Sequence, residues 1–139
     1  MLKLKLISVG KTKEEWLDSA IDEYVKRLKT TLSIEFLWVK NDEQLIAAVE
    51  KENGVICLDA AGQTMTSEQF SAFINKKFED NGSRLTLVIG GAEGLPVKLK
   101  QYALISLSLM TMTHQIVRLV LMEQLYRAFE IAKGTKYHK

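Results

Sequence analysis

The sequence predicts an α/β protein whose mostly parallel sheet has helices on both faces. Two observations predict this class. Apolar segments of strand length alternate with segments of helical apolar spacing along the whole chain, and this alternation is typical of parallel sheets. The chain has 139 residues, 47% of them hydrophobic and one of them proline, which is enough for one domain with a buried core. We therefore expect a single domain over residues 1–139, without linkers or repeats.

The first strand is predicted over residues 2–9, because residues 2–6 alternate leucine and lysine. Gly10 ends this strand, and residues 13–29 then place apolar side chains at helical spacing. Residues 32–39 are rich in apolar and aromatic side chains and form the second strand.

The second helix is predicted over residues 43–52. Asn41 or Asp42 can serve as its N-cap, and Gly54 stops it. The short apolar run at residues 55–58 is the third strand.

Thr66 or Ser67 caps the third helix, and Asn81-Gly82 closes it. The apolar residues 85–89 form the fourth strand.

A short helix is predicted from Pro96 to Gln101, because the missing N–H of proline costs nothing in a first turn. Residues 104–107 form the fifth strand. The last helix covers residues 114–132, and Gly134 ends it.

The net charge of +2 does not by itself indicate a nucleic-acid partner. Residues 1–29 carry seven Lys/Arg against five Asp/Glu, residues 30–112 seven against ten, and residues 113–139 five against two. Both ends of the chain are therefore basic and the middle is acidic. If the two ends meet on one face, that face could hold phosphates; otherwise these lysines are scattered and solvated.

Cys57 is the one cysteine and lies in an apolar run, so we expect a buried, reduced thiol and no disulfide. The two histidines come without a Cys/His set or an H-E-x-x-H motif, so we expect no metal. His114, at the start of a helix, is interpreted as structural. No apolar run approaches the about 20 residues of a membrane span, and the N-terminal apolar core is too short for a secretory signal. We expect a cytoplasmic protein that does not bind membranes.

A glycine-rich turn, residues 90–94, follows the fourth strand. It reads Gly-Gly-Ala-Glu-Gly, which is neither G-x-G-x-x-G nor a P-loop. Glycines let the backbone approach a ligand and supply N–H donors, but a plain tight turn needs glycines as well. Both interpretations stay open for this turn taken alone.

The segment between the fifth strand and the last helix, residues 106–113, holds hydroxyl side chains and methionines. Thr111 or Thr113 could simply be the N-cap of the helix, but a cap needs only one residue. The longer segment favours a loop that wraps a small, partly apolar ligand with backbone groups and flexible methionines. Because both turns follow strands of a parallel sheet, we expect them to share one pocket.

The last helix is apolar on almost all sides over residues 116–122, except at Arg118. A helix that lies on a sheet should keep one wet face, so we predict that a second copy covers it in a homodimer. Arg118 must then find a carboxylate or face a ligand, because an unpaired buried charge is costly. Glu123, Arg127 and Glu130 lie on one side of the helix. They form either an ion-pair ladder or, through Arg127, part of a catalytic site.

Several segments together resemble a known family. They are residues 87–95, residues 107–115, Arg118, residues 123–128 and Tyr137-His138, with residues 9–13, Tyr24 and Arg27 near the N-terminus. The chain resembles the RlmH family of small ribosomal RNA methyltransferases, minimal enzymes of the SPOUT class, over essentially its whole length. It is shorter than typical members between Val39 and Gly54.

The resemblance implies a SPOUT-type α/β fold with a C-terminal trefoil knot, and a homodimer. General topology rules alone do not favour a knot, because knots are rare. The implied reaction transfers a methyl group from S-adenosyl-L-methionine to N3 of a pseudouridine in helix 69 of the large-subunit (23S) rRNA, on the assembled ribosome. The implied cofactor-binding residues are Leu58, Gly91, Ser108, Leu109, Met110, Thr111, Met112 and Thr113.

Transfer to N3 requires that the imide proton leave, so a base or a donor to the developing oxyanion is expected. Under the resemblance, His138 is the candidate base, because histidine ordinarily titrates near neutral pH. Arg127 and Tyr137 are candidates for holding the nucleobase or its flanking phosphates, and lysines at both ends would bind the rRNA backbone. Two alternatives stay open: a SPOUT enzyme that methylates another RNA position, and a non-catalytic RNA-binding module.

Overall fold

Five strands form one sheet at the centre of the structure, a computed structural model that describes all 139 residues. The strand order is β2-β1-β4-β3-β5, and all four strand pairings are parallel. The strands are β1 (Leu2–Val9), β2 (Leu32–Val39), β3 (Val55–Thr64), β4 (Arg84–Ile89) and β5 (Ala103–Ser106). The helices are α1 (Glu15–Leu28), α2 (Asp42–Glu50), α3 (Ser67–Asp80), α4 (His114–Lys133) and the short 3₁₀ helix η1 (Val97–Gln101). The predicted α/β class is confirmed.

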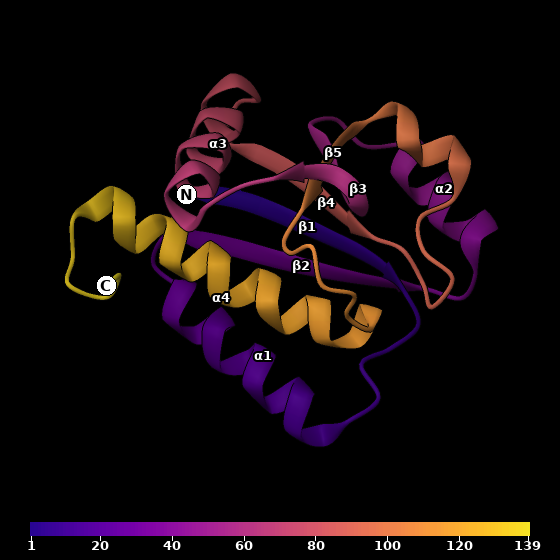
Figure 1. Cartoon of the computed structure of the whole chain (residues 1–139), viewed down its shortest axis with the longest axis horizontal. Coiled ribbons are helices and arrows are strands. Elements are labelled where there is room, and N and C mark those ends of the chain that lie inside the picture. Colours follow the sequence, from indigo (N-terminus) through magenta and orange to yellow (C-terminus); the bar gives the residue numbers. More distant parts are fainter.

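Helices cover both faces of the sheet, as predicted (Figure 1). α1, α3 and α4 pack on one face, over a core that includes Leu6 and Leu87. α2 and η1 pack on the other face, over Ile7 and Val88. Successive side chains of a strand point to opposite faces. The neighbours Leu6 and Ile7 therefore belong to different cores, and so do Leu87 and Val88. α4 lies between α1 and α3.

Side-chain caps fix the starts of three helices. Asn41, Thr66 and Thr113 each accept a hydrogen bond from the backbone N–H three residues further on, which satisfies a donor that the helix leaves free. α1 differs. It begins at Glu15, later than the predicted residue 13, and its N-cap Glu14 makes no capping bond.

The third strand is longer than the predicted residues 55–58. Residues 59–62 bulge, and the two residues after them pair with β5 again. Gly62 makes this possible, because a Cβ there would lie 2.6 Å from the backbone of Ile105. The predicted strand ended too early because the residues after Leu58 are mostly small or polar, which is not typical of a buried strand.

Two other boundaries are corrected. Pro96 precedes η1 and has extended backbone, with ψ 144°, so it does not form the first helical turn. β5 covers residues 103–106 in place of the predicted 104–107, which leaves Leu107 in the connection to α4.

Cys57 is fully buried in β3, as predicted. Burial, with a smaller effect of the Asp59 charge, raises the pKa of its thiol to about 12. The thiol is therefore protonated and unreactive at neutral pH. Separately, none of the helices combines the length and apolar content that crossing a bilayer requires.

Candidate active site

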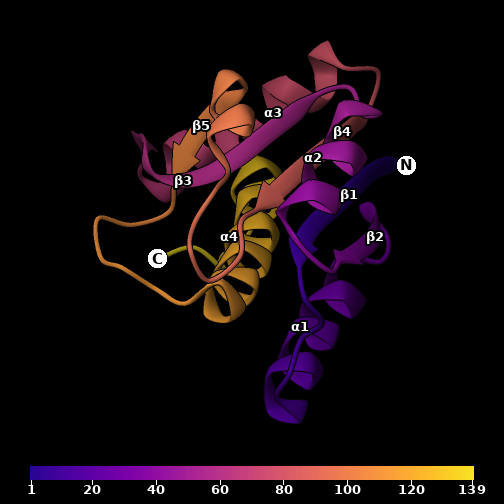
Figure 2. The same ribbon diagram turned by 90° about the vertical axis from the view of Figure 1, so that its right-hand side faces the viewer.

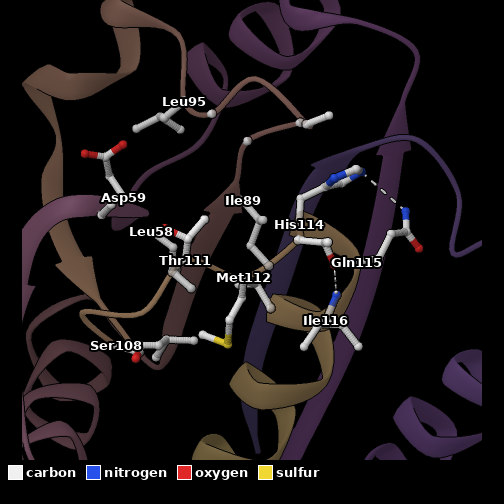
Figure 3. Close-up of a pocket in the computed structure, with 18 of the residues that line it drawn as sticks. Leu58, Asp59, Ile89, Leu95, Ser108, Thr111, Met112, His114, Gln115 and Ile116 are labelled. Atoms are coloured by element: carbon white, nitrogen blue, oxygen red, sulfur yellow. Dashed lines mark hydrogen bonds between the residues drawn. The ribbon is translucent and has the colours of Figure 1, made fainter.

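A cavity of about 630 Å³ lies where the chain leaves the carboxyl ends of β3, β4 and β5. The connections after these three strands line it, together with the first turn of α4 and the segment that joins β1 to α1 (Figure 3). In Figure 2, the segment between β5 and α4 swings away from the sheet before it returns to the helix. Parallel sheets bind ligands at this edge, and the two predicted turns do share one pocket.

The glycine turn after β4 is both a tight turn and a wall of the cavity. The Gly94 N–H donates to the Gly91 carbonyl at 3.0 Å, and Gly94 has a φ of +92°, which favours glycine. A Cβ on Gly90 would lie 2.5 Å from the backbone of Gly94, so a larger residue cannot fit without moving the turn. Gly91 lines the cavity. The tight-turn interpretation is therefore confirmed, and the binding-loop interpretation stays a prediction for a turn that lines the cavity.

The connection between β5 and α4 contributes most of the implied cofactor residues. Those that line the cavity are Ser108, Met110, Thr111, Met112 and Thr113. Leu109 does not line it, and its side chain is 89% exposed. Ser108 shapes the loop, because its hydroxyl accepts the Met110 N–H at 2.9 Å. Thr113 also caps α4, so the cap and the cavity wall share one residue.

Leu58 lines the cavity from the carboxyl end of the first part of β3. The next residue, Asp59, adds a carboxylate that was not predicted (Figure 3). Asp59 accepts the N–H of Ala61 at 3.0 Å, which shapes the start of the bulge. Its place directly after a buried parallel segment is the signal that could have identified it.

His114 and Gln115 line the cavity from the first turn of α4, although His114 was interpreted as structural. The Gln115 amide holds the β1–α1 segment, since its Oε1 accepts the Lys13 N–H at 3.1 Å and its Nε2 donates to the Lys11 carbonyl at 3.1 Å. Burial, then the charges of Arg118 and Lys13, lower the pKa of His114. At neutral pH the cavity therefore has an uncharged imidazole in its wall (Figure 3).

Arg118 was predicted to pair with a carboxylate or to face a ligand, and it does neither: its partners are uncharged oxygens, and it does not line the cavity. It is fully buried, and burial lowers its pKa to about 10, so it stays charged at neutral pH. Its guanidinium donates to four oxygens at the end of β1 and in the segment after it, at 2.7–3.2 Å. They are the hydroxyls of Ser8 and Thr12 and the carbonyls of Val9 and Gly10. Arg118 and Gln115 together fasten this segment to α4.

The three candidate catalytic residues form one hydrogen-bonded cluster with Glu123. Tyr137 donates to Glu123 Oε2 at 2.7 Å, and Arg127 Nη2 donates to the same oxygen at 2.9 Å. Arg127 Nη1 lies 3.0 Å from His138 Nδ1, and His138 Nε2 lies 3.1 Å from Glu68 Oε1. Because a guanidinium only donates, Nδ1 accepts and Nε2 donates to Glu68.

The charges of this cluster support one another. Burial alone would raise the pKa of Glu123, but the hydrogen bonds from Arg127 and Tyr137 outweigh it and lower that pKa. Burial, followed by the bond to Glu123, raises the pKa of Tyr137 to about 12. An ionised carboxylate thus holds a neutral phenol and a guanidinium. Of the predicted ion-pair ladder, only the pair of Glu123 and Arg127 forms, and it belongs to this network. Glu130 pairs with Lys133 at 3.7 Å instead.

The cluster and the cavity lie toward opposite ends of α4. The helix has 20 residues, or about 30 Å. The cavity is lined by α4 residues up to Val117, whereas the cluster starts at Glu123. His138, Arg127 and Tyr137 are therefore together, but none of them lines the cavity of its own chain.

The two basic ends of the chain meet beside the cluster. Lys133, in the last turn of α4, donates to the hydroxyl of Thr31 at 3.1 Å. The guanidinium of Arg27, near the end of α1, lies 5.6 Å from the ring centre of Tyr126. The condition set for a phosphate-holding face is met only in part, because Lys5 pairs with Glu52 and Lys13 lines the cavity. No group of three or more His, Cys, Asp or Glu side chains could hold a metal ion.

Comparison with known proteins adds independent information. A family model described as "Predicted SPOUT methyltransferase" matches residues 2–138. The chain is 60% identical over 140 residues, the full length of both proteins, to the ribosomal RNA large subunit methyltransferase H of Protochlamydia amoebophila. It is 38% identical over 159 residues to the proteins of the same name from Streptococcus agalactiae and Halothermothrix orenii, with 99% of this chain and all of each relative covered.

Proposed function

Because the chain belongs to the SPOUT methyltransferase family, and within it to the family of ribosomal RNA large subunit methyltransferase H, we propose that it methylates large-subunit (23S) rRNA. The finer proposal is transfer of a methyl group from S-adenosyl-L-methionine to N3 of a pseudouridine in helix 69, on the assembled ribosome. The observation that carries this proposal is the cavity at the carboxyl ends of β3, β4 and β5, which all the implied cofactor residues except Leu109 line.

The cavity suits S-adenosyl-L-methionine in size and chemistry. Its volume of about 630 Å³ lies within the range of sites that enclose a molecule of drug size. Leu58, Ile89 and Met112 offer apolar contacts for an adenine ring, while Asp59 offers a carboxylate for a cation or a hydroxyl. Bound there, the cofactor would supply a methyl carbon on a positively charged sulfonium. The trefoil knot of the family would be formed by the same connections that line the cavity.

The protein's own residues must orient the nucleobase and accept its N3 proton. We assign the proton to His138, and the holding of the base or its flanking phosphates to Arg127 and Tyr137. His138 Nδ1 accepts a hydrogen bond from Arg127 Nη1, so this nitrogen carries no proton and becomes a free acceptor once a phosphate takes up the Nη1 donor. Glu123 holds Arg127 and Tyr137 in position through its carboxylate.

A second copy of the chain would bring this cluster to a cavity. Between the two ends of α4, the apolar side chains of Ile116, Leu119 and Val120 are only half-buried. A two-fold axis perpendicular to α4 pairs the helices in antiparallel orientation. The cluster of each copy would then lie beside the cavity of the other. We therefore propose a homodimer in which both chains contribute to each site.

The basic residues beside the cluster suit contacts with the rRNA backbone. Lys133 lies near the basic end of α1, and Lys136 and Lys139 follow it in the sequence. Phosphate contacts from such residues position a nucleic acid without reading its sequence. Such a substrate places the protein in the cytoplasm, with the ribosomes.

Calorimetric titration with S-adenosyl-L-methionine tests the cofactor part of the proposal. The methyltransferase should show saturable binding, whereas a non-catalytic RNA-binding module need not take up this molecule. Absence of binding by the folded protein would contradict the proposal.

A further inference from the structure

Trp16 is the only aromatic side chain of the protein that is mostly exposed, at 58%. Phe36 and Trp38 stack on each other, and Tyr126 packs against both Tyr24 and Tyr137. Trp16 has no such ring partner, and it lines the cavity from the first turn of α1. The cavity therefore has a flat aromatic surface in its wall that packing within the chain does not use.

The position of Trp16 is fixed by contacts on both sides of it. The next residue, Leu17, is 1% exposed and anchors the first turn of α1 in the core. The preceding segment is fastened to α4 by Gln115 and Arg118. A rigid platform loses little conformational freedom when a ligand stacks on it.

The charge around Trp16 favours a nucleobase over a phosphate backbone as the occupant. Residues 11–18 carry two lysines and three carboxylates, so this wall is not a basic track of the kind that binds phosphates. Bases stack on aromatic side chains through their flat faces, which are uncharged. An enzyme that modifies the edge of a base must also receive that base out of its stack.

We propose that Trp16 is the stacking surface for an unpaired nucleobase of the rRNA substrate at the mouth of the cavity. The inference rests on the proposed function, because that function brings an unstacked base to this cavity. It adds a residue that the cofactor set and the catalytic cluster do not include. The competing occupant is a second copy of the chain, which would cover Trp16 in the dimer.

Kinetics of three variants test the proposal. Trp16→Ala removes the ring, Trp16→Phe keeps an aromatic ring, and Val97→Ala truncates a side chain that is 82% exposed outside the cavity. With ribosomes that lack the methyl group, Trp16→Ala should lower kcat/KM by about 5- to 150-fold, which corresponds to about 1–3 kcal/mol. Trp16→Phe should retain most of the activity, and Val97→Ala all of it.

Two further measurements on Trp16→Ala separate substrate stacking from the other roles. Affinity for S-adenosyl-L-methionine, by calorimetry, and dimer mass, by light scattering, should match those of the wild type. Unchanged kcat/KM would overturn the proposal. So would a loss of cofactor affinity as large as the loss of activity, which would assign Trp16 to the cofactor, or dissociation of the dimer, which would assign it to the second copy.

If the wild-type protein transfers no methyl group, the proposed function fails, but stacking on Trp16 can still be tested by fluorescence. A single-stranded, uridine-containing RNA oligonucleotide is titrated into the wild type and Trp16→Phe, with S-adenosyl-L-methionine present. Trp38 remains in both proteins as the reference. Stacking predicts quenching in the wild type that is lost in Trp16→Phe and absent with duplex RNA. Equal signals from the two proteins would reject the stacking surface.

Discussion

Arg118 of α4 lies over the indole ring of Trp38 in β2, with its guanidinium carbon 4.1 Å from the ring centre. A cation over an aromatic face is stabilised by the ring quadrupole, the more so when it is buried. At the same time, Nη2 of Arg118 donates to the carbonyls of Val9, at the end of β1, and of Gly10. One side chain thus joins three elements beside the cavity and needs no carboxylate partner.

The first prediction concerns Arg118→Met. This change keeps an apolar stem but removes the donors to the Val9 and Gly10 carbonyls. Hydrogen bonds to charged groups contribute about 1.5–3 kcal/mol each, and removal of the buried charge offsets part of that loss. We expect the free energy of unfolding to fall by about 3 kcal/mol in urea denaturation.

Arg84→Met is the matched control, because Arg84 is exposed at the start of β4. It should change stability by no more than about 0.5 kcal/mol. Equal stability of the two variants would show that the buried contacts of Arg118 do not hold the fold together.

The second prediction separates two neighbours in the implied cofactor loop. Thr111 lines the cavity and Leu109 does not. Thr111→Arg places bulk and a positive charge in the cavity proposed for a cofactor that carries a sulfonium, and like charges at close range repel. We expect its affinity for S-adenosyl-L-methionine to fall about tenfold or more, whereas Leu109→Arg should bind nearly as the wild type does. If calorimetry finds the same loss in both variants, the loop does not face the cavity as described.

The third prediction concerns alkaline pH. The pKa of Tyr137 is raised from 10.0 to about 12, so the folded protein favours the neutral phenol. Its contribution to stability is fully present below pH 10 and is lost as the pH rises to about 12. Tyrosinate absorbance, taken as the difference between the wild type and Tyr137→Phe, should show one tyrosine that titrates late. A difference centred near pH 10 would mean that the Glu123 contact does not form in solution.

The fourth prediction concerns the catalytic assignment. His138→Ala removes the proposed base but leaves the cavity intact, because His138 does not line the cavity of its own chain. Methyl transfer should fall by about 100-fold or more, with cofactor affinity unchanged. If His138→Ala turned over normally while it still bound cofactor, the base would have to be another group.

The fold was largely readable from the sequence because its signals are local. Apolar runs marked the strands, and a pair of candidate caps marked each of three helix starts. The structure selects Asn41, Thr66 and Thr113 from these pairs. The bulge in β3 was missed because it depends on the close approach of Gly62 to the backbone of Ile105. That contact joins residues far apart in the sequence, and the residue types at positions 59–64 do not indicate it.

In the candidate site, too, the local features could be predicted from the sequence and those that depend on distant contacts could not. The glycine turn and the segment after β5 were visible as motifs, while Asp59 and Gln115 join the cavity only through the topology of the sheet. The role of Arg118 was also missed, because its partners are backbone carbonyls and hydroxyls that carry no charge. A search for a carboxylate or a ligand could not find them.

Methyl transfer mapped to a single nucleotide tests the central claim most directly. The protein is incubated with S-adenosyl-L-methionine and either assembled ribosomes that lack the modification or free 23S rRNA, and the methylated nucleotide is located by mass spectrometry. We expect one added methyl group, on N3 of a pseudouridine in helix 69, with ribosomes and not with free rRNA. No methylation of either substrate, or a methyl group on a different nucleotide, would contradict it.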